Sequence, residues 1–141
     1  MDFKPFEKKL VAVLNEKMET GKILNALAHM ALGLGVSVPV KEELRLQDYQ
    51  DADQGIHSSI SDIPFIVLKA NSNQIRNLRK QLIELGISFT DFTNTVVDGT
   101  YVQQHENTQK TKEENLEYFG ICLLGEWNKV SELTKKFSLW K

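Results

Sequence analysis

The chain has 141 residues, of which 41% are hydrophobic and 26% are charged, a balance typical of one globular domain. A net charge of −2 argues against broad electrostatic binding to nucleic acid, which needs a strongly cationic surface. No apolar run approaches the roughly 20 residues that span a bilayer, and the N-terminus lacks the apolar region of a signal peptide. The single cysteine, Cys122, cannot form an internal disulfide, so we expect a reducing, cytoplasmic location.

The first third of the chain predicts a buried strand followed by a helix. Residues Leu10–Leu14 are continuously apolar, as in a strand that is covered on both faces. Residues Gly21–Leu34 have helical spacing, with Thr20 as the predicted N-cap and Gly33 or Gly35 as the predicted stop. The apolar residues expected to face the core are Ile23, Leu24, Leu27, Ala31 and Leu34.

The middle of the chain predicts a hairpin and a second strand–helix unit. Residues 44–57 are polar with some alternation and a turn near Gly55, which indicates a small hairpin or an ordered excursion. Pro64–Ala70 reads as a core strand with proline at its entrance, where a missing donor is tolerated. Ser72 is the predicted N-cap of a helix that ends at Gly86.

The last third predicts two more strands around a long polar segment. Residues 87–92 and 118–124 are apolar enough for a third and a fourth strand. The segment 94–115 is too long for a simple connection, so we expect an ordered or mobile insertion. A short helix over 126–135 and an extended segment over 137–140 follow. This alternation favours a layered α/β fold with a parallel or mixed sheet.

Five short motifs follow one another in a characteristic order and spacing. They are Leu24-Asn25, Asp51–Asp53, Pro64–Leu68, Asp91–Thr93 and Tyr118–Gly125, with Val130 and Leu139 behind the last of them. Through these motifs nearly the whole chain resembles an uncharacterised group, domain-of-unknown-function family number two thousand. The resemblance implies a peptidyl-tRNA hydrolase type II-like fold, with a mixed four-stranded sheet flanked by helices, in one domain over 1–141. It implies no reaction.

The segment from Thr20 to His29 is similar to the opening helix of the type II peptidyl-tRNA hydrolases. Their motif reads Lys-Gly-Lys-hydrophobic-Ala-Ala-Gln-Cys-Ser/Ala-His, which Gly21, Lys22 and His29 match. Thr20 replaces the first lysine, Ala26 replaces the glutamine, and an acidic residue after the third strand has no clear counterpart. These losses remove groups that would hold and polarise an ester carbonyl, so we expect little or no peptidyl-tRNA hydrolase activity.

Polar residues at the start of the first helix and the end of the third strand predict a ligand site. Lys22 lies near the exposed N–H groups of a first helical turn, where a phosphate or carboxylate binds well. The alternative interpretation is a solvated lysine, although the helix dipole disfavours a cation there. Strand ends line the crevice of such sheets. The candidate ligand-binding residues are Thr20, Gly21, Lys22, Asn25, Asp91 and Thr93.

Other polar residues favour structural interpretations. His29 fits the solvent face of its helix better than a cleft wall, and Cys122 fits a core position better than a nucleophile. The acidic residues around Asp51 fit a surface loop better than a metal site. A local basic patch is confined to residues 74–81, with Arg76, Arg79 and Lys80.

Three function classes stay open at this point. The first is binding of a small anionic ligand, the second is a diverged hydrolase that acts on an ester or amide, and the third is an interaction module with a dimer interface. The sequence assigns no catalytic residue, no metal and no cofactor. Partners that it leaves open are a small anionic ligand and a second copy of the chain, whereas nucleic acid and membranes are disfavoured.

Overall fold

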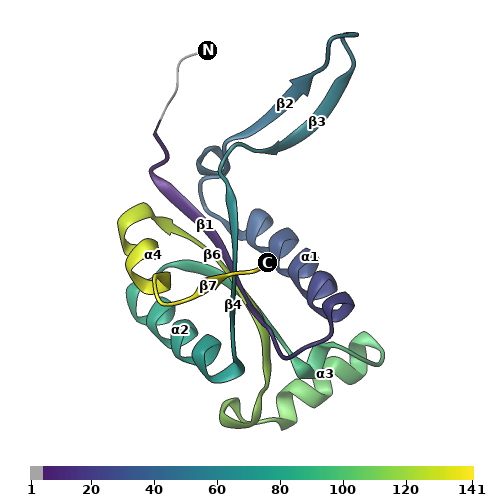
Figure 1. Cartoon of the computed structure of the whole chain (residues 1–141). Coiled ribbons are helices and arrows are strands. Elements are labelled where there is room, and N and C mark those ends of the chain that lie inside the picture. The colour runs from purple at the N-terminus through teal and green to yellow at the C-terminus, as the bar shows by residue number, and fades with distance from the viewer. Residues whose placement is uncertain (1–4) are drawn as a thin grey trace.

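Five strands form the main sheet, in the order β5-β6-β1-β4-β7 (Figure 1). The computed structural model describes residues 5–141. The strands are β1 (Lys8–Asn15), β4 (Phe65–Ala70), β5 (Ser88–Thr93), β6 (Tyr118–Glu126) and β7 (Ser138–Leu139). β1 and β4 are parallel, whereas β6 is antiparallel to both β1 and β5. The carboxyl ends of β1, β4 and β5 therefore lie at the same end of the sheet as the start of β6.

Helices cover both faces of this sheet, which gives the mixed α/β single-domain fold that the sequence predicts. α1 (Thr20–Ser37) lies on one face, and α2 (Ser72–Leu85) and α4 (Trp127–Thr134) lie on the other (Figure 1). β1 supplies both cores because its side chains alternate. Leu10, Ala12 and Leu14 pack with α1, whereas Val11 and Val13 pack with α2 and α4.

The predicted hairpin is confirmed as β2 (Leu46–Gln50) and β3 (Ile56–Ser61), which project away from the sheet (Figure 1). Asp51 holds the turn, because its Oδ1 accepts hydrogen bonds from the backbone N–H groups of Asp53 and Gly55, each at 2.9 Å. All residues of β2 and β3 except the last are exposed. The hairpin thus forms an arm rather than part of the core.

The expected four-stranded sheet is wrong by one strand. β7 pairs antiparallel with β4, through Leu139 opposite Leu68 and Ser138 opposite Lys69. The sequence indicates an extended segment here, but two residues are too few to carry a strand pattern. The pairing of β7 with β4 depends on how α4 directs the chain from β6 to the far side of the sheet. A local sequence pattern does not contain this information.

The predicted ends of the first helix also need correction. Glu19, not Thr20, occupies the N-cap, and its side chain makes no capping hydrogen bond. The helix continues past both glycines to Ser37, since burial of Leu34 and Val38 outweighs the cost of glycine in a helix. The predicted apolar stripe is shifted, because Leu24 is 59% exposed whereas Ala26 is fully buried.

The second helix begins one residue earlier than its predicted cap implies. Asn71 is the N-cap of α2 and forms a capping box with Gln74. The hydroxyl of Ser72 instead accepts a hydrogen bond from the backbone N–H of Tyr118 at 2.9 Å. Gly86 ends the helix in the left-handed conformation, as predicted.

The polar segment predicted as an insertion is ordered and contains a helix. α3 (Tyr101–Lys110) lies between the short 3-10 turns η2 (Asn94–Val96) and η3 (Glu113–Asn115). A capping box between Thr100 and Gln103 starts α3. Figure 1 shows α3 at the edge where β5 ends and β6 begins. None of the helices in the described part of the chain has the length and apolar character needed to cross a membrane.

Candidate functional site

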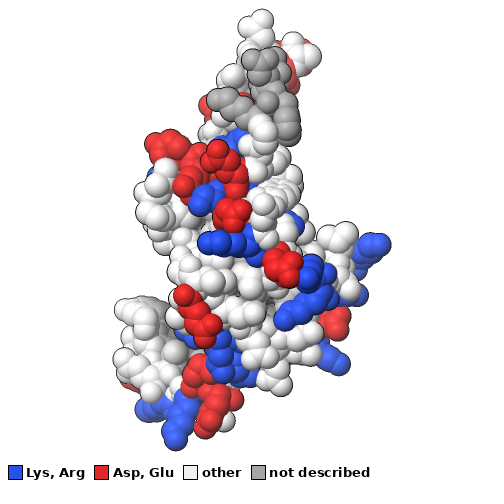
Figure 2. Space-filling view, turned by 90° about the vertical axis from the view of Figure 1, so that its left-hand side faces the viewer, with Lys and Arg blue, Asp and Glu red and all other residues white. Residues whose placement is uncertain are grey.

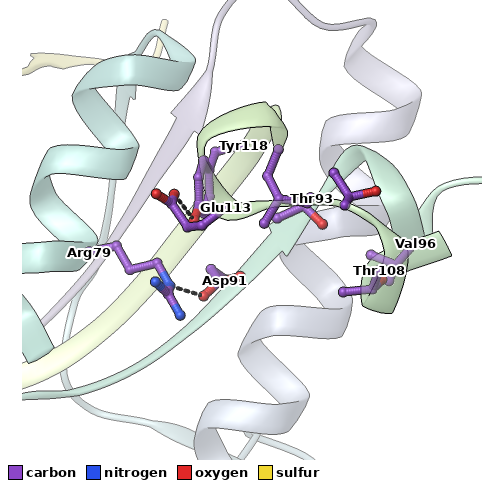
Figure 3. Close-up of a pocket in the computed structure, with 9 residues that line it drawn as sticks. Arg79, Asp91, Thr93, Val96, Thr108, Glu113 and Tyr118 are labelled. Carbon is purple, nitrogen blue, oxygen red and sulfur yellow. Dashed lines mark hydrogen bonds and ion pairs between the residues drawn. The ribbon is translucent and has the colours of Figure 1, made fainter. Parts of the chain in front are cut away.

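A pocket of about 350 Å³ opens at the edge of the sheet between β5, β6, α2 and α3 (Figure 3). The sheet topology creates it, because the end of β5 and the start of β6 lie side by side and the α3 segment connects them. Its lining residues are Arg79, Asp91, Thr93, Val96, Thr108, Thr111, Glu113, Leu116 and Tyr118.

An ion pair joins α2 to β5 on one side of the pocket. Nε of Arg79 donates a hydrogen bond to Oδ2 of Asp91 at 2.9 Å, and the guanidinium carbon lies 5.8 Å from the ring centre of Phe89. Burial disfavours the charge on Arg79, but the hydrogen bond and charge of Asp91 outweigh it and raise the pKa of Arg79. No atom within residues 5–141 accepts a hydrogen bond from its two terminal nitrogens. These nitrogens are therefore available to a ligand.

A second cluster closes the neighbouring wall of the pocket. Arg76 pairs with Glu113, with 3.0 Å between Nε and Oε2, and also donates to the backbone carbonyl of Leu116. The hydroxyl of Tyr118 donates to Oε2 of Glu113 at 2.8 Å. Burial, together with this hydrogen bond, raises the pKa of Tyr118 to about 12, and the same hydrogen bond lowers the pKa of Glu113. Neither group titrates near neutral pH, where a general acid or base works best.

The wall opposite Arg79 includes Thr93 and Thr108, which are joined through the buried Thr95. The hydroxyls of Thr93 and Thr95 lie 2.8 Å apart, and the hydroxyl of Thr108 lies 2.7 Å from that of Thr95. Thr93 and Thr95 are buried, so these hydrogen bonds tie α3 to the end of β5. Figure 3 shows Thr93 and Thr108 on this side of the pocket, with Arg79 and Asp91 on the other.

The comparisons with known proteins give a family without a described activity. The model of the family "Protein of unknown function (DUF2000)" matches residues 8–141. The chain belongs to the DUF2000 family. A solved structure of a protein of unknown function from Agrobacterium tumefaciens is similar, with a TM-score of 0.83 at 17% identity, covering 97% of this chain and 100% of that chain. At this identity the likeness shows the fold alone. No curated protein matches the sequence.

The structure of this DUF2000 protein separates the predicted site residues into two groups. Asp91 and Thr93 line the pocket described above. Phe92, between them, faces the other way and packs in the core beneath α1, as the alternation of a strand requires. Lys22 and Asn25 lie on α1, on the opposite face of the sheet from Arg79 and Asp91.

The start of α1 itself faces solvent. The side chain of Lys22 makes no hydrogen bond or ion pair with any residue in the described range 5–141. His29 is exposed, and its ring centre lies 5.9 Å from that of Phe92. The exposed candidate residues in this segment are Thr20, Gly21, Lys22 and Asn25.

Arg79, Glu113 and Tyr118 were not predicted as site residues. Arg79 stands in the basic segment 74–81, which the sequence singles out only as a local patch. The sequence places Tyr118 in a strand and Glu113 in the polar segment 94–115. The sequence does show Asp91 at the end of a strand and a cationic helix before that strand. Only the folded structure shows that Arg79 of this helix pairs with Asp91.

The described residues contain neither a group of side chains that could hold a metal ion nor an exposed thiol. Within residues 5–141, no three His, Cys, Asp or Glu side chains lie close enough to hold a metal ion. Cys122 is buried in β6, and burial raises the pKa of its thiol to about 12. Asp51 and His57 of the hairpin pair in the open, with 2.8 Å between Oδ2 and Nε2.

The surface beside the pocket carries both signs of charge. Figure 2 shows lysine and arginine side chains interspersed with aspartate and glutamate over the side of the molecule that carries α2 and α4. This mixture does not form the continuous cationic surface that tracks a nucleic-acid backbone. The geometry favours a small ligand at a defined pocket.

Proposed function

We propose that this DUF2000 protein binds a small anionic ligand in the pocket between α2, β5 and β6. The observation that carries the proposal is the geometry of Arg79. Asp91 holds its Nε at 2.9 Å, the ring of Phe89 lies alongside, and both terminal nitrogens lack a protein acceptor within the described residues. A guanidinium held in this way presents two parallel donors that match a carboxylate or a phosphate group.

The rest of the pocket limits the size and character of the ligand. Asp91 and Glu113 are both paired with arginines, so the two carboxylates do not leave an uncompensated negative charge. Val96 and Leu116 add apolar surface. A volume of about 350 Å³ lies at the low end for ligand pockets. The ligand class is therefore a small molecule with one anionic group and a short apolar part.

The exposed start of α1 is the other place for such a ligand. There Lys22 would supply charge, Asn25 an amide, and the backbone near Thr20 and Gly21 free N–H groups. We place the ligand at Arg79 instead, because Asp91 lies with Arg79 and not with Lys22. The Lys22→Ala variant distinguishes the two places, since it weakens binding by about tenfold only if Lys22 touches the ligand.

The alternative function is a diverged hydrolase with a peptidyl-tRNA hydrolase type II-like fold, acting on an ester or amide. Gly21, Lys22 and His29 favour it through their match to the hydrolase motif. Two positions count against it, since Thr20 carries no charge and Ala26 is fully buried in the core beneath α1. We therefore infer binding rather than peptidyl-tRNA hydrolysis. Turnover of peptidyl-tRNA at rates close to those of a genuine type II enzyme would overturn this inference.

The test combines ligand discovery with a matched pair of variants. Native mass spectrometry of the purified protein identifies small molecules that it retains, and calorimetry with a panel of monocarboxylates and monophosphates measures affinity. Arg79→Gln should weaken binding by about tenfold or more, because a charge-assisted hydrogen bond contributes ~1.5–3 kcal/mol. Lys129→Gln makes the same charge change at an exposed position on α4, which does not line the pocket, and should have little effect. Equal losses in both variants would refute a specific role for Arg79.

A further inference from the structure

The outer face of α1 is apolar and exposed along most of the helix. Leu24, Leu32 and Val36 are 59%, 71% and 70% exposed, and Ala28 lies on the same face. Lys22 is the only charged residue of the 18-residue helix, if histidine is counted as neutral. Asn25 and His29 are also exposed on this side, but three large apolar side chains in one strip are more typical of a protein–protein contact than of free surface. The sheet covers the inner face, so the outer face is suited to a partner.

The β2–β3 hairpin is a second exposed surface beside the C-terminal end of α1 (Figure 1). It exposes Ile56 and Ile60 by more than 60% each. It also carries Asp48, Asp51 and Asp53, with no lysine or arginine among residues 46–61. A two-stranded hairpin is only marginally stable alone in water, so a contact along its length would stabilise it.

We propose that both surfaces bind a second copy of this chain in a twofold-symmetric dimer. The two α1 helices pack antiparallel, with Leu24 beside the partner's Val36 and Ala28 beside the partner's Leu32. These pairs fit an antiparallel register, since each step along one helix is matched by an equal step back along the other. The small Ala28 at the centre lets the two helices approach closely.

Charge complementarity supports a second copy as the occupant. In an antiparallel pair, the hairpin at the C-terminal end of one α1 lies beside the N-terminal end of the other. That end carries Lys17 and Lys22, whose side chains have no partner within residues 5–141, together with Glu16, which pairs with Lys69, and Glu19. Because Lys69 compensates Glu16, the acidic hairpin meets two unpaired lysines and one unpaired glutamate, a net positive end. This contact also explains a lysine in the first turn of α1, where the helix dipole disfavours a cation.

The area that a dimer needs explains why the hairpin takes part. A helix of this length presents a strip about 27 Å long and about 10 Å wide, or roughly 270 Å². A specific dimer buries roughly 800 Å² on each partner, so the α1 face alone is too small. The hairpin, which projects from the same molecule with exposed isoleucines, supplies further area.

Sedimentation velocity and light scattering test the dimer directly. The wild-type protein should have twice the 16.1 kDa mass of the chain. Leu32→Glu should be monomeric, with an unchanged circular dichroism spectrum, because Leu32 does not contribute to the core. Ile83→Glu is the control, since Ile83 is 53% exposed on α2, and this variant should remain a dimer. A wild-type monomer at every concentration tested, or a dimeric Leu32→Glu variant, would overturn the proposal.

A charge reversal tests the hairpin contact separately. Lys22→Glu should weaken the dimer several-fold at low salt, because it places a negative charge against the acidic hairpin. Adding Asp53→Lys to this variant should restore part of the affinity, since the two charges are then exchanged. Asp53 suits this exchange because its side chain makes no hydrogen bond or ion pair within the described residues. A dimer constant unaffected by Lys22→Glu would overturn the proposed place of the hairpin.

Discussion

The two long helices that cover opposite faces of the sheet differ on their outer sides rather than on their inner ones. α1 and α2 both bury aliphatic side chains against the same strands. The outer side of α2 is mostly polar, with Asn77, Lys80, Gln81 and Glu84 exposed beside Ile83 and Leu85 near its end. Two ion pairs of its arginines connect the helix to β5 and η3. The outer side of α1 carries leucine and valine. Burial therefore explains the fold on both faces, and the outer residues indicate what each face does.

The helix ends differ in the same way. α2 begins with the capping box of Asn71 and Gln74, whereas the N-cap of α1, Glu19, makes no side-chain bond. The C-terminal end of α1 is stabilised instead from outside the helix, because Nζ of Lys41 donates hydrogen bonds to the carbonyls of Gly35, Val36 and Val38. A cation at this end is also favoured by the helix dipole.

The largest expected difference separates two leucines of α1. Leu34→Ala should lower the free energy of unfolding by about 2–5 kcal/mol, because it leaves a cavity beneath the helix. Leu32→Ala should change it by less than about 0.5 kcal/mol when measured on the monomer, since Leu32 faces outward. Urea denaturation at low protein concentration measures both. Similar losses in the two variants would contradict the inner and outer assignment.

A smaller difference is expected between the two helix starts. Asn71→Ala removes a capping side chain and should cost about 1 kcal/mol. Glu19→Ala should be almost neutral, because no capping hydrogen bond is lost. Thermal denaturation of the two variants beside the wild type gives the comparison. A larger cost at Glu19 than at Asn71 would show that α1 depends on its N-cap after all.

The smallest expected effect is a loss of stability at alkaline pH, which comes from one titrating side chain on each face of the sheet. Tyr118, on the α2 side, and Cys122, on the α1 side, have pKa values raised to about 12 from ordinary values of 10.0 and 9.0. The folded protein therefore holds these protons at pH values where the unfolded chain has lost them. Stability should be complete below pH 9 and fall as the pH rises towards 12.

Single substitutions separate the two contributions to this alkaline loss. Cys122→Ala should reduce the slope of stability against pH from about pH 9 upward, and Tyr118→Phe should reduce it only from about pH 10 upward. Urea midpoints at a series of alkaline pH values measure both slopes. Slopes identical to that of the wild type in both variants would contradict the assignment to these groups.

Much of the fold follows from local sequence patterns. Apolar runs predict β1, β4, β5 and β6, and helical spacing with nearby caps predicts α1 and α2. α3 was missed because it buries no side chain, so it has no apolar stripe to detect. Its start was nevertheless readable, since Thr100 and Gln103 have the spacing of a capping box.

The site was less accessible from sequence than the fold. Asp91 and Thr93 were predicted because they end a strand, and they do line the pocket. Their expected neighbours on α1 lie on the other face, because side chains alternate along β5 and Asp91 points towards α2. Arg79 and Glu113 reach the pocket through contacts between elements that are distant in sequence. No local pattern contains that information.

Nuclear magnetic resonance titration with a carboxylate or phosphate ligand found by mass spectrometry tests the central claim most directly. The account predicts shifts of backbone amide signals at Arg79, Asp91, Thr93 and Tyr118, which surround the pocket. The signals of Lys22 and Asn25 should stay unchanged, since they lie on the opposite face of the sheet. Shifts centred on Lys22 and Asn25, with none around Arg79, would contradict the account and place the ligand at the start of α1.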